Sequence, residues 1–151
     1  KVSGGISRLK AKEPKQRKRH STFFLTISTN QKYKSDDPHL ESDAEFFDNS
    51  LRGILDNIGG YLKIDGEWSP DTIHDANIDY SVEVGRNLKG SALHAHILFR
   101  FQHSAKTLHL DYTAIKKKLL NDLGLKSLYV FNRVVRGGGT VSLLEYIDKY
   151  K

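Results

Sequence analysis

Leu93-His94-Ala95-His96-Ile97-Leu98-Phe99 is a short apolar run that contains two histidines one residue apart. Successive side chains of an extended strand point to opposite faces of a sheet. His94 and His96 therefore share one face, while Ala95 and Ile97 belong to the other, apolar face, which we assign to the core. Two neutral imidazoles side by side can begin a divalent metal site, which also needs at least one harder ligand.

The harder ligand comes from an earlier stretch, residues 78–84, which alternates in the same way. Val82 falls on its apolar face and Glu83 on the opposite face. Residues 85–91 are rich in turn formers, so the two stretches are predicted to pair as an antiparallel hairpin. The carboxylate then shares a face with both imidazoles, and three metal ligands are predicted: Glu83, His94 and His96.

Hydrophobic spacing and turn residues predict the remaining elements. Alternating β-rich stretches indicate further strands at residues 22–28, 61–64 and 127–132. Helical spacing indicates three helices, which begin at the Ser42–Glu45 capping box, at Asp111, and at Thr140 or Ser142. The predicted fold class is α+β: a mostly antiparallel sheet of about five strands with flanking helices.

Length and composition indicate one globular domain. The chain has 151 residues, 38% of them hydrophobic, which is enough for a substantial core. The absence of cysteine excludes disulfides and a thiolate zinc site. No run of residues has the pattern of a membrane span or a signal peptide, so we expect an intracellular protein without membrane contact. Residues 1–20 lack a hydrophobic period and are interpreted as a flexible basic arm, followed by a domain at residues 21–151.

Charge is unevenly distributed along the chain. Residues 1–20 contain eight Lys and Arg against one acid, residues 21–85 four against thirteen, and residues 86–151 twelve against four. Clustered cations suit a polyanion such as nucleic acid, because Lys and Arg contacts to phosphates release condensed counterions. Cations that only solvate the surface are the alternative explanation.

A second group of candidate functional residues lies on the last predicted helix. Tyr146, Lys149 and Tyr150 are spaced i, i+3 and i+4, so they share one face. A tyrosine hydroxyl, with an ordinary pKa of about 10, is a poor nucleophile. It can attack phosphorus when a metal ion polarises the phosphate and a lysine lies nearby. We therefore predict Tyr146 and Lys149 as catalytic residues.

Together these motifs resemble the HUH endonuclease superfamily, and most closely the replication initiator (Rep) endonuclease domains of small circular single-stranded DNA viruses, such as geminiviruses and circoviruses. Phe24-Leu25-Thr26 resembles the first motif of that family, a strand that helps origin recognition. His94-Ala95-His96 resembles the second motif, and Tyr146-Ile147-Asp148-Lys149 resembles the third, which carries the nucleophile. Glu83 matches the acidic metal ligand by its position on the preceding strand, and the resemblance spans residues 22–151 in the family's order.

The resemblance implies an activity and a set of partners. It implies an RRM-like or ferredoxin-like HUH fold that binds Mg²⁺ or Mn²⁺ and nicks and joins DNA at a stem-loop origin through a 5′-phosphotyrosine, which initiates rolling-circle replication. Single-stranded DNA and stem-loop origin DNA are the implied partners, with self-association through a full-length protein that continues into a helicase domain. For a eukaryotic virus the host nucleus is the implied location.

Several residues are predicted to contact DNA, by the resemblance or by their charge: Phe24, Leu25, Thr26, Arg100, Lys116, Lys117 and Tyr150. A structural salt bridge is the alternative role of Arg100, and a solvated helix face is the alternative role of the two lysines. The spacing of Tyr150 after Tyr146 is that of relatives with two tyrosines, so a second nucleophile stays open. We favour Tyr146 because it lies in the tyrosine–x–x–lysine pattern.

Two functions of other classes compete with the nickase. A non-catalytic, RRM-like module that binds single-stranded nucleic acid would carry stacking aromatic residues on the open face of its central strands. A mononuclear metal enzyme would use two histidines and one carboxylate as a facial triad. The triad explains Glu83, His94 and His96, but it leaves the basic charge and the Tyr146 helix without a role.

Overall fold

The computed structural model describes residues 19–34, 36–64, 73–84, 92–135 and 139–150. Its strands are β1 (Arg19–Lys32), β2 (Leu62–Ile64), β3 (Ile73–Val84), β4 (Ala92–His103), β5 (Leu108–Leu110) and β6 (Tyr129–Val134). Its helices are α2 (Leu40–Asp56), the 3₁₀ turn η1 (Ile58–Tyr61), α3 (Tyr112–Leu123) and α4 (Gly139–Tyr150). No helix in these described ranges combines the length and the apolar character needed to cross a membrane.

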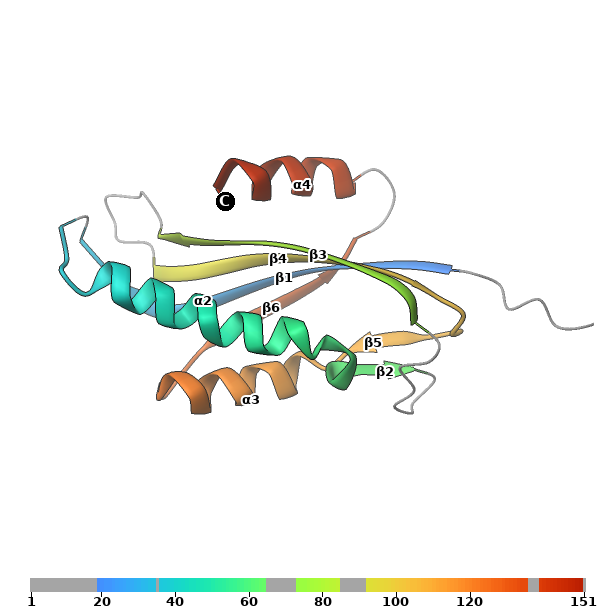
Figure 1. The fold of residues 1–151 in the computed structure, drawn as a ribbon, viewed down its shortest axis with the longest axis horizontal. Helices are drawn as coiled ribbons and strands as arrows, with labels where there is room; N and C mark the ends of the chain where they lie inside the picture. Colours follow the sequence, from blue (N-terminus) through green and yellow to red (C-terminus); the bar gives the residue numbers. More distant parts are fainter. Residues whose placement is uncertain (1–18, 35, 65–72, 85–91, 136–138, 151) are drawn as a thin grey trace, which may run out of the picture.

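The central sheet has four strands in the order β3-β4-β1-β6, and every neighbouring pair is antiparallel (Figure 1). The α+β class and the mostly antiparallel sheet are therefore confirmed. The expectation of about five strands in one sheet is wrong, because β2 pairs with β5 in a separate two-stranded sheet. The sequence analysis missed β5, whose three residues, Leu108–Leu110, are too short a run to show a period.

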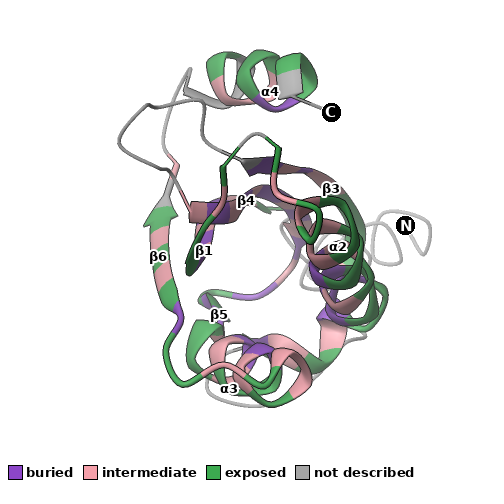
Figure 2. Ribbon diagram, turned by 90° about the vertical axis from the view of Figure 1, so that its left-hand side faces the viewer, coloured by how far each residue is buried: buried purple, intermediate pink, exposed green. Residues whose placement is uncertain are grey.

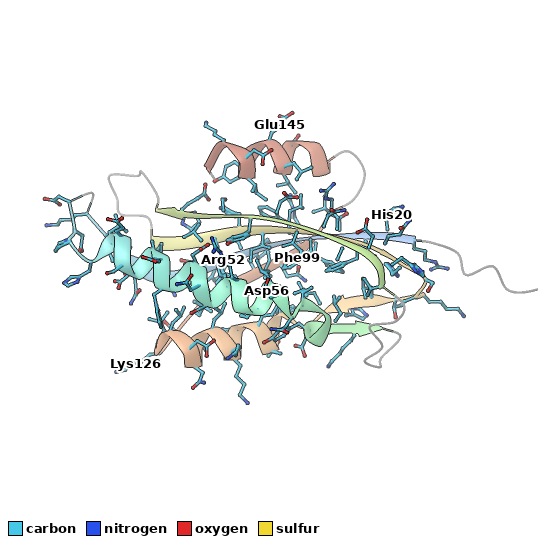
Figure 3. The ribbon with its side chains drawn as sticks, viewed as in Figure 1. His20, Arg52, Asp56, Phe99, Lys126 and Glu145 are labelled. Atoms are coloured by element: carbon cyan, nitrogen blue, oxygen red, sulfur yellow. The ribbon has the colours of Figure 1, made fainter. Side chains whose placement is uncertain are left out.

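Helices α2 and α3 cover one face of the central sheet and enclose the main core (Figure 1). The apolar side of β4 enters this core through Ala95, Ile97 and Phe99, as the alternation predicts. Phe23, Leu25 and Ile27 of β1 enter it beside them. Figure 3 shows Phe99 on this side of the sheet. Because these side chains are buried, the opposite face of β1 and β4, which carries His94 and His96, is directed away from the main core.

Helix α4 lies on the opposite face of the sheet, away from α2 and α3 (Figure 2). It packs through Ile147 onto Phe24 and Leu98, which form a second, smaller apolar cluster. The three layers are therefore α2 with α3, the central sheet, and α4. The face that carries the two histidines is the face that α4 covers.

Element boundaries differ from the predictions where local signals were misinterpreted. Arg19 and His20 belong to β1, so the predicted arm at residues 1–20 is two residues too long; residues 1–18 lie outside the described part. The prediction that a capping box at Ser42–Glu45 begins the first helix is wrong. Helix α2 already begins at Leu40, and Ser42 Oγ donates to the carbonyl oxygen of His39. The Asp37 carboxylate instead accepts the N–H of His39 at 2.8 Å, just ahead of the helix.

The later boundaries are closer to expectation. Asp111 caps α3, its carboxylate accepting the N–H of Ala114 at 3.1 Å, and Gly124 ends the helix in the left-handed conformation at φ 63°. Strand β6 lies two residues later than the predicted 127–132. Helix α4 begins at Gly139, one residue before the earlier of its two predicted starts.

Candidate metal centre

The β3–β4 hairpin brings the three predicted ligands together. Its register pairs Glu83 directly with His94, and Ser81 with His96, so all four side chains project from the same face. Glu83 Oε2 lies 3.3 Å from His94 Nε2 and 3.2 Å from His96 Nε2. One ligand atom from each of Glu83, His94 and His96 lies within 4.8 Å of the others, so the cluster could bind a metal ion.

Hydrogen bonds behind the imidazoles fix which nitrogen each ring presents. Nδ1 of His94 lies 2.7 Å from the carbonyl oxygen of Ala92, an acceptor, so Nδ1 carries a proton and Nε2 is the nitrogen directed at the cluster. Nδ1 of His96 lies 3.1 Å from Oγ1 of Thr26 on the neighbouring strand β1. Both rings are thus held with Nε2 directed toward the Glu83 carboxylate, as in metal sites with outer-shell partners.

Burial shifts the pKa of two of the three candidate ligands. Glu83 is only 7% exposed, and burial raises its pKa; the charge of His94 and the hydrogen bonds from Tyr146 and His94 act against that rise. Burial, followed by the effect of His94, lowers the pKa of His96 to about 4, so this imidazole is neutral near pH 7. A neutral imidazole is the form that ligates metals.

A further polar atom lies beside the cluster. Ser81 Oγ is buried opposite His96 and has no hydrogen-bond partner among the described residues. Buried polar atoms of this kind are rare, and a water or an added ligand commonly satisfies them. Two imidazoles, one carboxylate and a nearby hydroxyl make a donor set that could bind a divalent metal ion.

Helix α4 places Tyr146 against this cluster. The Tyr146 hydroxyl lies 3.5 Å from Glu83 Oε2, the carboxylate oxygen that both imidazoles approach. Its ring meets His96 edge to face, with centroids 5.2 Å apart. Tyr146 is 39% exposed, while the adjacent Ile147 is fully buried and anchors the helix. Figure 3 shows Glu145 on the side of α4 that faces away from the sheet.

The other residues of the third motif lie further along α4. Lys149 is exposed in the last turn, three residues after Tyr146, and keeps its predicted place on the same helix. Nothing in the described residues assigns it a catalytic role, which stays a prediction. The side chain of Tyr150 lies outside the described part, so the question of a second nucleophile also stays open.

The first motif divides between the two faces of β1. Phe24 stacks on His96, with ring centroids 5.4 Å apart and an angle of 14°, and Thr26 bonds to the same imidazole. Leu25 points the other way and is 0% exposed in the main core. The prediction that Leu25 contacts DNA does not fit this structure, because strand alternation buries it against α2 and α3.

The predicted cationic contacts lie away from the cluster. Arg100 forms an ion pair with Asp79 at 3.2 Å, which is the structural alternative that we considered for it. Lys116 and Lys117 belong to α3, on the far side of the sheet from the metal ligands (Figure 1). One DNA strand that contacts both the cluster and α3 would have to pass around the edge of the sheet.

The sequence analysis missed a group of residues beside the cluster. A cavity of about 260 Å³ adjoins His96 and Tyr146, and the missed residues that line it are Phe131, Arg133 and Leu143. The alternation of β6 is visible in the sequence. Its neighbour in the sheet is not, because β1 and β6 are far apart along the chain and their pairing depends on the tertiary fold.

Comparison with known proteins assigns no family. No protein-family model matches the chain, and its sequence matches no curated protein significantly.

Proposed function

We propose that this chain is a metal-dependent, site-specific and strand-specific DNA nickase and strand transferase of the HUH type, which opens a stem-loop origin for rolling-circle replication. The observation that carries the proposal is the 3.5 Å contact between the Tyr146 hydroxyl and the one carboxylate oxygen that both imidazoles approach. A nucleophile, a metal-ligand set and an open approach therefore coincide. The four-stranded antiparallel sheet with helices on both faces supports the HUH fold that the proposal implies.

The proposed reaction is a transesterification at phosphorus. The Tyr146 oxygen attacks the scissile phosphate, a P–O bond to the tyrosine forms, and the P–O3′ bond to the preceding nucleotide breaks. The phenol loses its proton and the departing 3′ oxygen gains one, so the products are a 5′-phosphotyrosine and a free 3′-hydroxyl. Attack by a 3′-hydroxyl reverses the step and rejoins the strand, because the phosphodiester energy is conserved in the covalent link.

The chain's own residues have distinct tasks in this reaction. Glu83, His94 and His96 would hold a divalent cation, which when bound polarises the phosphate and stabilises the charge that develops on its oxygens. Glu83 also accepts the hydrogen bond of the phenol and so directs the nucleophile toward the cluster. Ile147 seats α4 on the sheet, and Lys149 is proposed to position the phosphate or the phenol.

A covalent-adduct assay tests the proposal. The substrate is a pool of stem-loop oligonucleotides with randomised loops and a fluorophore at the 3′ end, incubated with MnCl₂. A 5′-phosphotyrosine retains the 3′ label on the protein in a denaturing gel, whereas a 5′ label is released. We expect Tyr146→Phe to abolish the adduct. The control Tyr112→Phe alters an exposed tyrosine on α3 and should leave the adduct unchanged.

Two results would contradict the nickase. One is the absence of adduct from the wild-type protein with both Mn²⁺ and Mg²⁺, and the other is an undiminished adduct in the Tyr146→Phe variant. If the adduct is retained in Tyr146→Phe and lost in Tyr150→Phe, the nucleophile is Tyr150 and not Tyr146.

A non-catalytic module that binds single-stranded nucleic acid is the second candidate. Exposed aromatic side chains at Tyr129 and Phe131 on strand β6 favour it, because such residues stack on unpaired bases. This candidate predicts binding of single-stranded DNA without any covalent adduct, so the same gel, combined with a binding measurement, separates the two functions.

A further inference from the structure

The edge strand β6 presents three exposed side chains on one face, spaced two residues apart: Tyr129, Phe131 and Arg133. Tyr129 is 53% and Phe131 49% exposed, which is unusual for such large apolar groups. The register pairs Phe131 with Thr26 of β1, and directly paired residues project from the same face. Thr26 in turn bonds to His96, so this face of β6 continues the face of the metal cluster.

A pocket connects the exposed ring to the reacting groups. The cavity of about 260 Å³ is bounded by Phe131 on one side and by His96 and Tyr146 on the other. Phe24 also lines it, and its ring lies flat against the His96 imidazole. An occupant of this pocket would therefore meet aromatic surfaces and would lie beside the Tyr146 hydroxyl.

Charge at the pocket favours an anionic occupant. The Arg133 guanidinium lies over the Phe24 ring, 5.7 Å from its centroid. Within the described ranges no carboxylate pairs with Arg133, so its positive charge faces the pocket uncompensated. Aromatic rings next to an unpaired arginine match a nucleotide, which has a flat base and a charged phosphate. An apolar protein segment would use the rings but would leave the guanidinium without a partner.

We propose that this pocket takes one unpaired base of the DNA strand next to the scissile phosphate, stacked on Phe131, while Arg133 contacts a backbone phosphate. The inference rests on the proposed function for the identity of the substrate. A base within a duplex is already stacked on both sides, so the pocket selects single-stranded DNA. It also sets the distance along the strand between the held base and the phosphate that Tyr146 attacks.

The test measures binding separately from cleavage. Fluorescence anisotropy with a single-stranded oligonucleotide of mixed sequence is recorded in EDTA, so that no metal-dependent reaction occurs. Phe131→Ala should weaken binding roughly tenfold to a hundredfold, the range for loss of a base-stacking aromatic side chain. Phe131→Trp should restore it. The matched control is Phe46→Ala, an equally exposed phenylalanine at 54% on α2, which should bind as the wild type does.

A second probe separates stacking from a general structural effect. An oligonucleotide of the same length, with abasic residues throughout, keeps the phosphates and removes the bases. Phe131→Ala should leave its affinity for this probe unchanged, because the lost contact is to a base. Arg133→Gln should weaken the binding of both probes by similar factors. It should also reduce the slope of log affinity against log salt concentration by the amount expected for about one phosphate contact.

Each outcome bears on the proposal. Wild-type affinity in Phe131→Ala, or equal losses on the base-bearing and abasic probes, would overturn it, as would an absence of single-stranded DNA binding by the wild-type protein. If the covalent adduct forms while Phe131→Ala binds normally, the nickase stands and the base pocket fails. If Phe131→Ala loses only base-dependent affinity and no adduct forms, the pocket stands and the nickase fails.

Discussion

At the scale of single residues, the centre depends on how one imidazole is oriented. His96 is held by Thr26 at Nδ1 and by the flat contact with Phe24, both from strand β1. These contacts direct its Nε2 toward Glu83. Thr26 and Phe24 therefore have a structural task at the candidate metal site, because they orient one of its three candidate ligands. Outer-shell partners of this kind commonly alter metal affinity without being ligands.

Replacement of Thr26 by valine tests this role. Thr26→Val keeps the shape of the side chain and removes the hydroxyl, so His96 can rotate and change tautomer. We expect the affinity for Mn²⁺, measured by isothermal titration calorimetry, to fall roughly tenfold to a hundredfold. Thr26→Ser retains the hydroxyl and should bind Mn²⁺ as the wild type does. Unchanged affinity in Thr26→Val would show that the hydroxyl does not orient the ligand.

At the scale of elements, α4 has a smaller apolar anchor than the other helices. Its buried contacts are Ile147, Phe24 and Leu98, with Leu143 and Leu144 partly buried against them, whereas α2 and α3 share the extensive main core. A helix held by few buried side chains can open locally without global unfolding. Tyr146, the proposed nucleophile, is thus carried by a helix with a small apolar anchor, which suits a residue that must reach the phosphate, become covalently attached and be released.

Hydrogen exchange should show whether α4 opens locally while the main core stays folded. Ile147→Ala removes the buried anchor, at a cost of about 2 to 5 kcal/mol for an isoleucine-to-alanine change. We expect faster exchange in α4, while the central strands and α3 keep their protection. The matched variant Ile115→Ala, at a similarly buried site on α3, should instead lower the stability of the whole domain. Uniformly faster exchange in Ile147→Ala would contradict the local attachment.

At the scale of the whole molecule, the three candidate metal ligands come from two strands of the central sheet, so metal binding at this site would be coupled to folding. An ion that binds only the folded state stabilises it by about 2.7 kcal/mol at a concentration one hundred times its dissociation constant. For a domain of about this size the melting temperature should then rise by roughly 5 to 10 °C. The site also requires neutral imidazoles, as found for His96.

Thermal unfolding with and without MnCl₂ measures this coupling. MnCl₂ should raise the melting temperature of the wild-type protein by the amount given above, and EDTA should reverse this rise. His94→Ala should abolish the shift because it removes one ligand. His109→Ala, which alters an exposed histidine on β5 outside the cluster, should keep it. A shift of equal size in His94→Ala would place the metal elsewhere on the protein.

The distribution of charge along the sequence differs from its distribution in the folded molecule. Along the chain, acidic and basic segments are separate, which suggested one basic surface for a polyanion. In the folded molecule the acid-rich α2 and the lysines of α3 lie beside each other on the layer opposite the metal ligands (Figure 1). Arg133 on β6 instead lines the pocket that adjoins the cluster. Charge segregation along a chain is therefore a poor guide to charge segregation on its surface.

Features that depend on local periodicity can be predicted from the order of the residues. Alternation along residues 78–84 and 93–99, joined by a turn, already places Glu83 opposite the two histidines, because strand geometry sets which side chains share a face. The capping residue Asp111 and the terminal Gly124 likewise define α3 through their own backbone preferences.

Contacts between distant elements could not be predicted in this way and became visible in the folded molecule. The pairing of β6 with β1 brings Phe131 and Arg133 to the cluster, β2 leaves the central sheet for β5, and α4 packs on the histidine face. Periodicity says which side of each element is apolar, but not which other apolar side will cover it. That choice depends on how the whole set of elements buries its surface at once, which is a property of the packed molecule.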